Sequence, residues 1–153
     1  MVIVLDVFTR SVRCWSLSYS LDQQLTLEAL KMVLGQGTPL IHHSDQGVQY
    51  AAYAYIDLLK AHGVQISMPA VGKAEENGCA ERFIRTIKED EVALPEYNDF
   101  ADANHQIGRF IQEMYMTKRI HSSLGYQIPT ESEDAYRSSL DSQRVKISPL
   151  LIP

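Results

Sequence analysis

Apolar and polar positions at the start of the chain follow the pattern of two strands joined by a tight turn. Residues 2–8, VIVLDVF, and residues 12–18, VRCWSLS, are rich in the β-branched and aromatic side chains that favour strands. The intervening TRS, residues 9–11, is short and polar. The pattern therefore predicts an antiparallel hairpin.

The following segments alternate between helical and extended patterns. Asp22 is placed to cap a helix with apolar positions every three to four residues, and Gly35 predicts its end. Residues 38–44, TPLIHHS, predict a strand, residues 48–63 a helix, and residues 64–68 another strand. A strand–helix–strand order favours a parallel pair with a crossover connection. The expected class is α/β, with the hairpin as part of the same sheet.

The second half of the chain is mainly helical in pattern. Residues 68–76, MPAVGKAEE, contain proline and glycine without an apolar period and predict a loop. Asn77 is placed to cap a long helix that ends at Pro95, and Asp99 a helix that runs to about Arg119.

A turn-rich connection, residues 121–131, precedes a predicted short helix that begins near Thr130 and runs through Leu140. The remaining tail, residues 141–153, alternates weakly and then becomes apolar. We therefore expect one domain over residues 1–140 and a separate tail.

Composition narrows the possible classes of function. With 153 residues, 45% of them apolar, the chain can bury the core of one soluble domain. Its net charge of −5 argues against binding nucleic acid by bulk charge, so such contacts would be local. Cys14 and Cys79 are too few for a disulfide framework or a zinc site. No segment resembles a membrane span or a secretion signal, and a cytoplasmic location is expected.

Two carboxylates lie in positions suited to chemistry. Asp45 follows a predicted strand, where open α/β sheets bind their ligands, although an aspartate there often caps a helix or hydrogen-bonds its own turn. Glu81 lies near the start of the helix after the loop, with Arg85 and Lys88 on the same face. Surface salt bridging is the alternative for Glu81. The two carboxylates are separated by 35 residues, which is room for a helix, a strand and a loop.

Three ordered motifs together resemble the integrase core of bacterial insertion-sequence transposases, which are relatives of retroviral integrases. They are HSDQGVQY, ENGCAERFIRTIKEDEV and RIHSSLGYQIPTE, and the hairpin LDVFTRSVRCWSLS also resembles that of the family. The resemblance covers residues 2–136, nearly the whole chain. It implies a ribonuclease H-like fold and an acidic signature of Asp, Asp and, 35 residues later, Glu.

The resemblance implies roles for individual residues. Asp45 and Glu81 match the second and third acidic positions, which in the family bind two Mg²⁺ or Mn²⁺ ions for phosphodiester chemistry. Lys88, Arg85 and Lys73 match cations that contact DNA phosphates, the alternative being solvated surface charges.

Further residues would support that site and its assembly. Gln46, Gly47 and Asn77 are expected to shape the metal site or to hold its loops. The implied partners are DNA, as element ends and target, and further copies of the chain in a homodimer or higher multimer, with no membrane.

The first catalytic aspartate of the family has no match in these 153 residues. It belongs to a strand upstream of the hairpin, so Asp6 in the hairpin is a doubtful metal ligand. A structural role for Asp6 with Thr9 and Arg10 is favoured. The strand that carries the family's first aspartate is the central one of the sheet, and without it two strand edges would be open. Either residues 144–152, RVKISPLLI, fill that space, or a dimer completes the sheet.

The expected function is that of an integrase or transposase catalytic core, with metal-dependent phosphodiester cleavage and DNA strand transfer. Because one acidic ligand is not present, we expect weak or no activity from this chain alone. The alternative is an inactive module that binds DNA ends or oligomerises with a full-length transposase. Three histidines could also take part: His42 is expected to face the core or the neighbouring strand, His43 could reach Asp45, and His121 favours a structural hydrogen bond.

Overall fold

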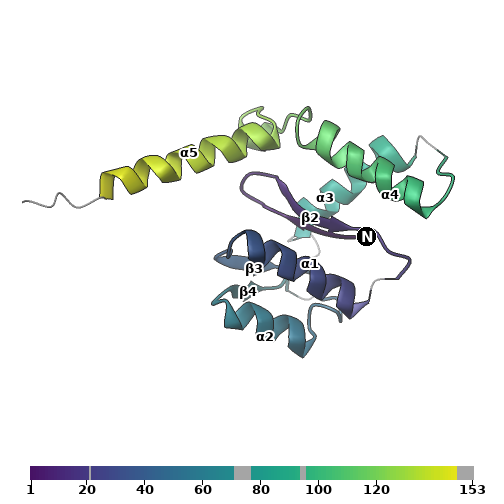
Figure 1. Ribbon diagram of the computed structural model, residues 1–153, viewed down its shortest axis with the longest axis horizontal. Coiled ribbons are helices and arrows are strands. Elements are labelled where there is room, and N and C mark those ends of the chain that lie inside the picture. Colours follow the sequence, from purple (N-terminus) through teal and green to yellow (C-terminus); the bar gives the residue numbers. More distant parts are fainter. Residues whose placement is uncertain (21, 71–76, 94–95, 148–153) are drawn as a thin grey trace, which may run out of the picture.

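A computed structural model describes residues 1–20, 22–70, 77–93 and 96–147, with the backbone alone from residue 141 onward (Figure 1). The elements follow in the order β1 (Val2–Leu5), β2 (Val12–Ser16), α1 (Gln23–Gln36), β3 (Ile41–His43), α2 (Tyr53–Ala61), β4 (Gln65–Ser67), α3 (Gly78–Ile87), η2 (Lys88–Val92), α4 (Phe100–Arg109), η3 (Phe110–Tyr115), η4 (Ser122–Leu124) and α5 (Pro129–Ile147). Both η2 and η3 are π-helical continuations of the helices before them, and η4 is a 3₁₀ turn.

The predicted hairpin is confirmed, and both of its faces are covered. Strands β1 and β2 pair antiparallel. Val2 and Val4 pack in a cluster with Ala29 and Val33 of α1, while the intervening apolar residues of β1 pack against the core of α3, α4 and η3. Burial on both faces explains why this strand is apolar at every position instead of at every second one.

Helix α1 begins as predicted and ends later than predicted. The Asp22 side chain accepts a hydrogen bond from the backbone N–H of Leu25 at 2.8 Å, which satisfies one of the free amides of the first turn. Gly35 lies inside the helix, and the C-cap is Gly37 instead. Two glycines lie within three residues of each other there, so the sequence alone did not indicate which one ends the helix.

The predicted parallel crossover is also confirmed. Strands β3 and β4 are parallel and are connected through α2. Helix α2 begins at Tyr53 and not near residue 48, because the preceding residues form a turn in which the amides of Tyr50 and Ala51 bind the carbonyl oxygen of Gly47.

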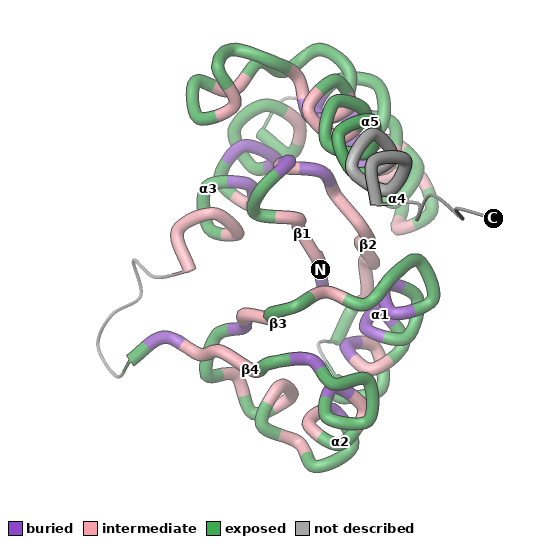
Figure 2. Tube along the Cα trace, turned by 90° about the vertical axis from the view of Figure 1, so that its left-hand side faces the viewer, coloured by how far each residue is buried: buried purple, intermediate pink, exposed green. Residues whose placement is uncertain are grey.

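The expectation of one continuous sheet is wrong for this structure. The described strands form two separate two-stranded sheets, one of β1 with β2 and the other of β3 with β4. Helix α1 joins the two halves, because Ala29 and Val33 pack on the hairpin while Leu30 and Leu34 pack against α2 and Val64. Figure 2 shows β1 and β3 as strands of the two separate sheets, each with one edge that takes no strand partner among the described residues.

The C-terminal part forms a long helix that leaves the body of the molecule (Figure 1). Helix α5 begins at Pro129, so Thr130 lies inside it, and it continues to Ile147 instead of ending near Leu140. The strand pattern expected from residue 144 onward is helical as far as Ile147, and the last six residues lie outside the described part. None of the described helices is long and apolar enough to cross a bilayer.

Candidate functional site

Asp45 lies in an exposed turn directly after β3. Its Oδ1 accepts a hydrogen bond from the backbone N–H of Gly47 at 2.8 Å, which is the turn contact that the sequence left open as an alternative. The second carboxylate oxygen makes no hydrogen bond within the described residues. Asp45 therefore has one oxygen that orients it and one that is available to a ligand.

The two residues after Asp45 hold this turn. The side-chain amide of Gln46 donates to the carbonyl oxygen of Pro69 at 2.9 Å, which ties the turn to the segment after β4. A Cβ on Gly47 would lie 2.8 Å from Asp45 Oδ1 and 2.5 Å from the amide nitrogen of Gln49. Position 47 therefore has no room for a side chain unless Asp45 or Gln49 moves.

The two histidines of β3 contact neighbouring elements, not Asp45. Burial, together with the neighbouring His43, lowers the pKa of His42, so this imidazole stays neutral. Burial raises the pKa of Tyr55 well above its usual value, and its hydroxyl lies within hydrogen-bond distance of His42 Nε2, at 2.9 Å. His43 Nδ1 lies 2.9 Å from the Ser67 hydroxyl of β4. Both histidines thus help to hold β3 in place.

Glu81 and the two expected DNA-contacting cations occupy one exposed face of α3 and its continuation. The opposite face packs into the core through Phe83, Thr86 and Ile87. Glu81, Arg85 and Lys88 are exposed, and no ion pair joins them within the described residues. Among the described residues, the salt-bridging alternative for Glu81 therefore has no support.

Two further predicted site residues have different outcomes. Asn77 occupies the N-cap position of α3, but its side chain makes no capping hydrogen bond. Lys73 lies outside the described residues.

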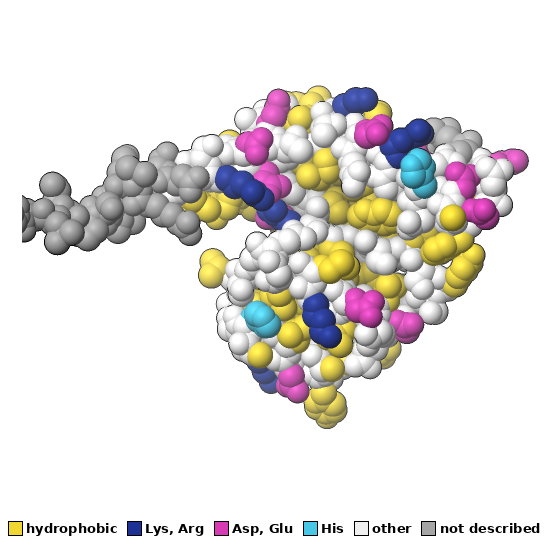
Figure 3. Space-filling model, in the orientation of Figure 1, with side chains coloured by type: hydrophobic (Ala, Val, Ile, Leu, Met, Phe, Trp, Pro, Cys, Tyr) yellow, Lys and Arg dark blue, Asp and Glu magenta, His cyan; other side chains and the backbone are white. Residues whose placement is uncertain are grey.

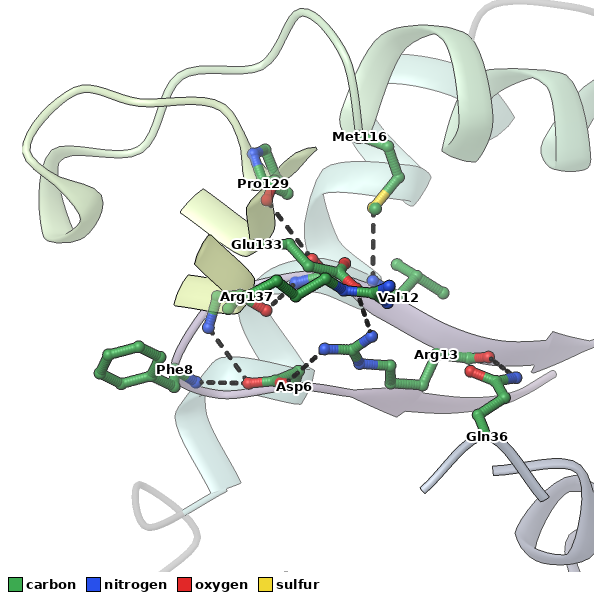
Figure 4. A network of polar contacts seen from close by, with 11 residues as sticks. Asp6, Phe8, Val12, Arg13, Gln36, Met116, Pro129, Glu133 and Arg137 are labelled. Atoms are coloured by element: carbon green, nitrogen blue, oxygen red, sulfur yellow. Dashed lines mark hydrogen bonds and ion pairs between the residues drawn. The ribbon is translucent and has the colours of Figure 1, made fainter. Parts of the chain in front are cut away.

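Asp6 forms part of the hairpin and of its connection to α5 (Figure 4). Its Oδ1 accepts from the amides of Phe8 and Thr9, and its Oδ2 pairs with Arg13 at 2.8 Å. Although burial opposes it, hydrogen bonds from Arg13 and these two amides hold the pKa of Asp6 below its ordinary value. The prediction that Arg10 contacts Asp6 is wrong, because the cation that pairs with Asp6 is Arg13.

Arg13 also connects the hairpin to α5. Its other guanidinium nitrogen lies 2.7 Å from Glu133, which accepts as well from Arg137 one turn later. Burial opposes the ionised form of Glu133, but hydrogen bonds from Ser11, Arg13 and Arg137 lower its pKa. Asp6 and Glu133 are thus both held in ion pairs with arginines and have a structural role.

Sequence reasoning missed one contact next to the candidate site. Arg10, in the hairpin turn, donates from Nη1 to Sγ of Cys79 in the first turn of α3. Tyr115 and His121 stack edge to face at 5.3 Å between ring centroids. Burial raises the pKa of Tyr115 to about 12 against the opposing charge of Arg10. Burial, Arg119 and Arg10 all lower the pKa of His121. The two contacting residues are 69 positions apart, and no local pattern signals such a pair.

The candidate ligands come from separate elements, and their number is small. The start of α3 and the ends of β3 and β4 lie on the same side of the molecule, on the left in Figure 2. Among the described residues, no group of three or more His, Cys, Asp or Glu side chains could hold a metal ion. Two exposed carboxylates suit one Mg²⁺, which accepts few protein oxygens and completes its shell with water and phosphate, but they do not form a two-metal centre.

Known families match nearly the whole chain. Two family profiles, each described as "Integrase core domain", match residues 1–74 and residues 62–129. The chain belongs to the integrase core domain family.

The curated relatives include bacterial transposases. The transposase for insertion sequence element IS904 of Lactococcus lactis is 33% identical over 132 residues, which is 84% of this chain and 52% of that protein. The putative transposase InsK for IS150 of Escherichia coli K12 is 31% identical over 149 residues, which is 93% of this chain and 50% of that protein. The chain thus spans about half the length of these relatives.

The solved structures agree in fold. The catalytic core domain of BIV integrase covers 94% of this chain and 87% of its own, with a TM-score of 0.62 at 17% identity. The HTLV-2 integrase catalytic core, solved as a dimeric form with magnesium, covers 84% and 79% with a TM-score of 0.51 at 15% identity. The fold is the ribonuclease H-like fold of integrase cores, as expected from the sequence.

Proposed function

We propose that this chain is the strand-transfer core of a bacterial insertion-sequence transposase, acting in DNA integration by metal-dependent phosphodiester cleavage and strand transfer. Its family and the names of its relatives support the class of reaction. The single structural observation that carries the proposal is the exposed face of α3, where Glu81, beside Arg85 and Lys88, makes no ion pair with any other described residue. Charged side chains left unpaired on one face are available to a metal ion and to DNA phosphates.

In this proposal, each residue has a specific task. Asp45 and Glu81 would hold a divalent cation through carboxylate oxygens, and such a cation would supply Lewis-acid activation of the phosphodiester. Gly47 and Gln46 orient Asp45 through the contacts described above. Arg85 and Lys88 hold the DNA backbone against α3, which fixes its register without reading its sequence.

A second candidate function has its own observation. The described residues bring no third acidic ligand to Asp45 and Glu81, since Asp6 is engaged with Arg13. A two-metal reaction needs such a ligand to bridge the ions. The chain would then bind DNA ends, or form mixed multimers with a full-length transposase, without catalysing the reaction.

One assay separates the two functions. A labelled duplex carrying the terminal sequence of the parent element is incubated with the chain and Mg²⁺ or Mn²⁺, and cleaved and joined products are resolved on a gel. Products that disappear with Glu81→Gln and persist with Glu89→Gln support the catalytic core. Glu89 is a matched control because it is exposed on the adjoining segment η2. DNA binding without any product, in both metals, supports the inactive module.

A further inference from the structure

The start of α3 lacks the feature that most often fixes a helix N-terminus. Four backbone amides there have no partner within the helix, and a side chain at the N-cap position commonly satisfies one of them. Asn77 is at that position without making the bond. The direction of the first turn, and so of Glu81, must therefore depend on another contact.

Arg10 supplies such a contact from the hairpin, 69 positions before Cys79 in the sequence. It lies in the hairpin turn with a φ of 62°, a left-handed conformation that is uncommon for a residue with a side chain. The turn is itself immobilised, because Thr9 and Ser11 on either side of it are almost fully buried. From this fixed base the Arg10 guanidinium reaches Cys79, two residues before Glu81.

The stability of α3 alone does not explain why the Arg10 guanidinium lies at its N-terminus. The N-terminus of a helix carries a partial positive charge, so a guanidinium near the first turn is electrostatically unfavourable for the helix itself. Next to Arg10 the helix packs through Phe83, whose ring meets that of Tyr115 edge to face at 4.5 Å. That packing holds the buried side of the first turn of α3, and the contact between Arg10 and Cys79 holds the turn at a second position.

We propose that Arg10 is a positioning residue, whose contact with Cys79 fixes the first turn of α3 and thereby the direction of Glu81. This inference rests on the proposed function for its consequence, which is metal binding by Glu81. The contact between Arg10 and Cys79 is independent of the proposed function. The two parts can therefore be measured separately.

Amide hydrogen exchange tests the contact. In an α-helix the amides of Arg82 and Phe83 bind the carbonyl oxygens of Gly78 and Cys79, so they report on the first turn. Arg10→Asn removes the guanidinium and keeps a residue that tolerates the left-handed conformation. We expect exchange at these two amides to accelerate about fivefold, the factor given by one typical hydrogen bond, while exchange in α1 is unchanged.

Variants of Cys79 keep the test decisive if Arg10→Asn does not fold. Cys79→Ala removes the acceptor and should reproduce the faster exchange, whereas Cys79→Ser restores an acceptor and should return exchange toward the wild-type rate. Arg13→Gln, which alters the same hairpin at its contact with α5, should leave these amides unaffected. Unchanged exchange in both Arg10→Asn and Cys79→Ala would overturn the proposal.

Metal affinity then tests the consequence. Mn²⁺ binding to the whole chain is followed by the loss of the free-ion signal in electron paramagnetic resonance, well below the melting temperature. We expect Arg10→Asn to weaken binding about fivefold and Glu81→Gln to weaken it further, with Cys79→Ser close to wild type. If Glu81→Gln has no effect on Mn²⁺ binding, the proposed function fails, while the exchange result still decides the positioning role. If Glu81→Gln weakens binding and Arg10→Asn does not, Arg10 does not position Glu81.

Discussion

The side-chain amide of Gln46 donates a hydrogen bond to the carbonyl oxygen of Pro69, 23 residues further along the chain. Through this bond the turn that carries Asp45 is attached to the segment after β4, which leads toward α3 and Glu81. Asp45 is thus oriented by its own bond to the amide of Gly47, and the turn that carries it is held by the bond from Gln46 to the segment after β4. The hydrogen bonds that orient Asp45 are therefore distinct from the apolar packing that stabilises the fold.

Gly47→Ala should reduce metal binding with little effect on stability. The new Cβ would meet the ends of two flexible side chains, Asp45 and Gln49, which can move at low cost. We expect the free energy of unfolding to change by less than about 0.5 kcal/mol, because no atom of the core is displaced. Displacement of Asp45 should weaken Mn²⁺ binding about tenfold, as measured by paramagnetic resonance. Val48→Ala is the control, because this side chain of the same turn is exposed and should change neither quantity.

Local elements of this fold could be predicted because their signals are local. The Asp22 cap, the apolar hairpin and the β3–α2–β4 crossover each follow from residues close together in sequence. The predicted helix boundaries were wrong where the local sequence signal is ambiguous. Helix α2 begins after Ala52, which has no capping side chain, and α5 passes Leu140 because the sequence contains no glycine or proline until Pro149.

The arrangement of the sheets and the surroundings of the site depend on contacts between distant residues. The resemblance predicted that two strand edges would be open without the central strand, and β1 and β3 each have an edge without a partner among the described strands. The division into two separate sheets follows from these open edges, although the hairpin was expected to join the same sheet. Spacing and family resemblance selected Asp45 and Glu81, but the partner of Asp6 was predicted as Arg10 when it is Arg13. Both arginines lie in or next to the same turn, and only the folded hairpin determines which one faces α5.

Gly108→Ala should destabilise the packing of α4 on the hairpin. A Cβ at this position would lie 2.8 Å from the Trp15 ring, which is rigid and held by the surrounding core. Overpacking of this kind costs about 1–3 kcal/mol, which exceeds the gain of about 1 kcal/mol from helix propensity. We expect a lower melting temperature and altered fluorescence of Trp15, the single tryptophan in the chain. Gly35→Ala, also within a helix but with open space around it, should instead stabilise the protein.

The connection between the hairpin and α5 depends on one arginine. Arg13 lies between Asp6 and Glu133, and the three side chains are less than a third exposed. Its replacement leaves the half-buried Asp6 without its cation and leaves Glu133 with the exposed Arg137 alone. Arg13→Gln should therefore lower the free energy of unfolding by about 2 kcal/mol, as for hydrogen bonds to charged groups. Arg137→Gln is the control, because the exposed Arg137 also contacts Glu133, and such surface pairs contribute little.

The same connection should make stability depend on acid pH. The pKa values of Asp6 and Glu133 are lower in the folded chain than their ordinary values of 3.8 and 4.5, so below those values the unfolded chain binds protons more readily than the folded one. Their contribution is therefore complete above about pH 5 and is lost as the pH falls through the folded pKa values. Urea unfolding between pH 6 and 3 should show a steep loss for wild type and a shallower one for Arg13→Gln. Equal slopes would mean that Arg13 does not depress these pKa values, since the histidine contributions are common to both proteins and cancel in the difference.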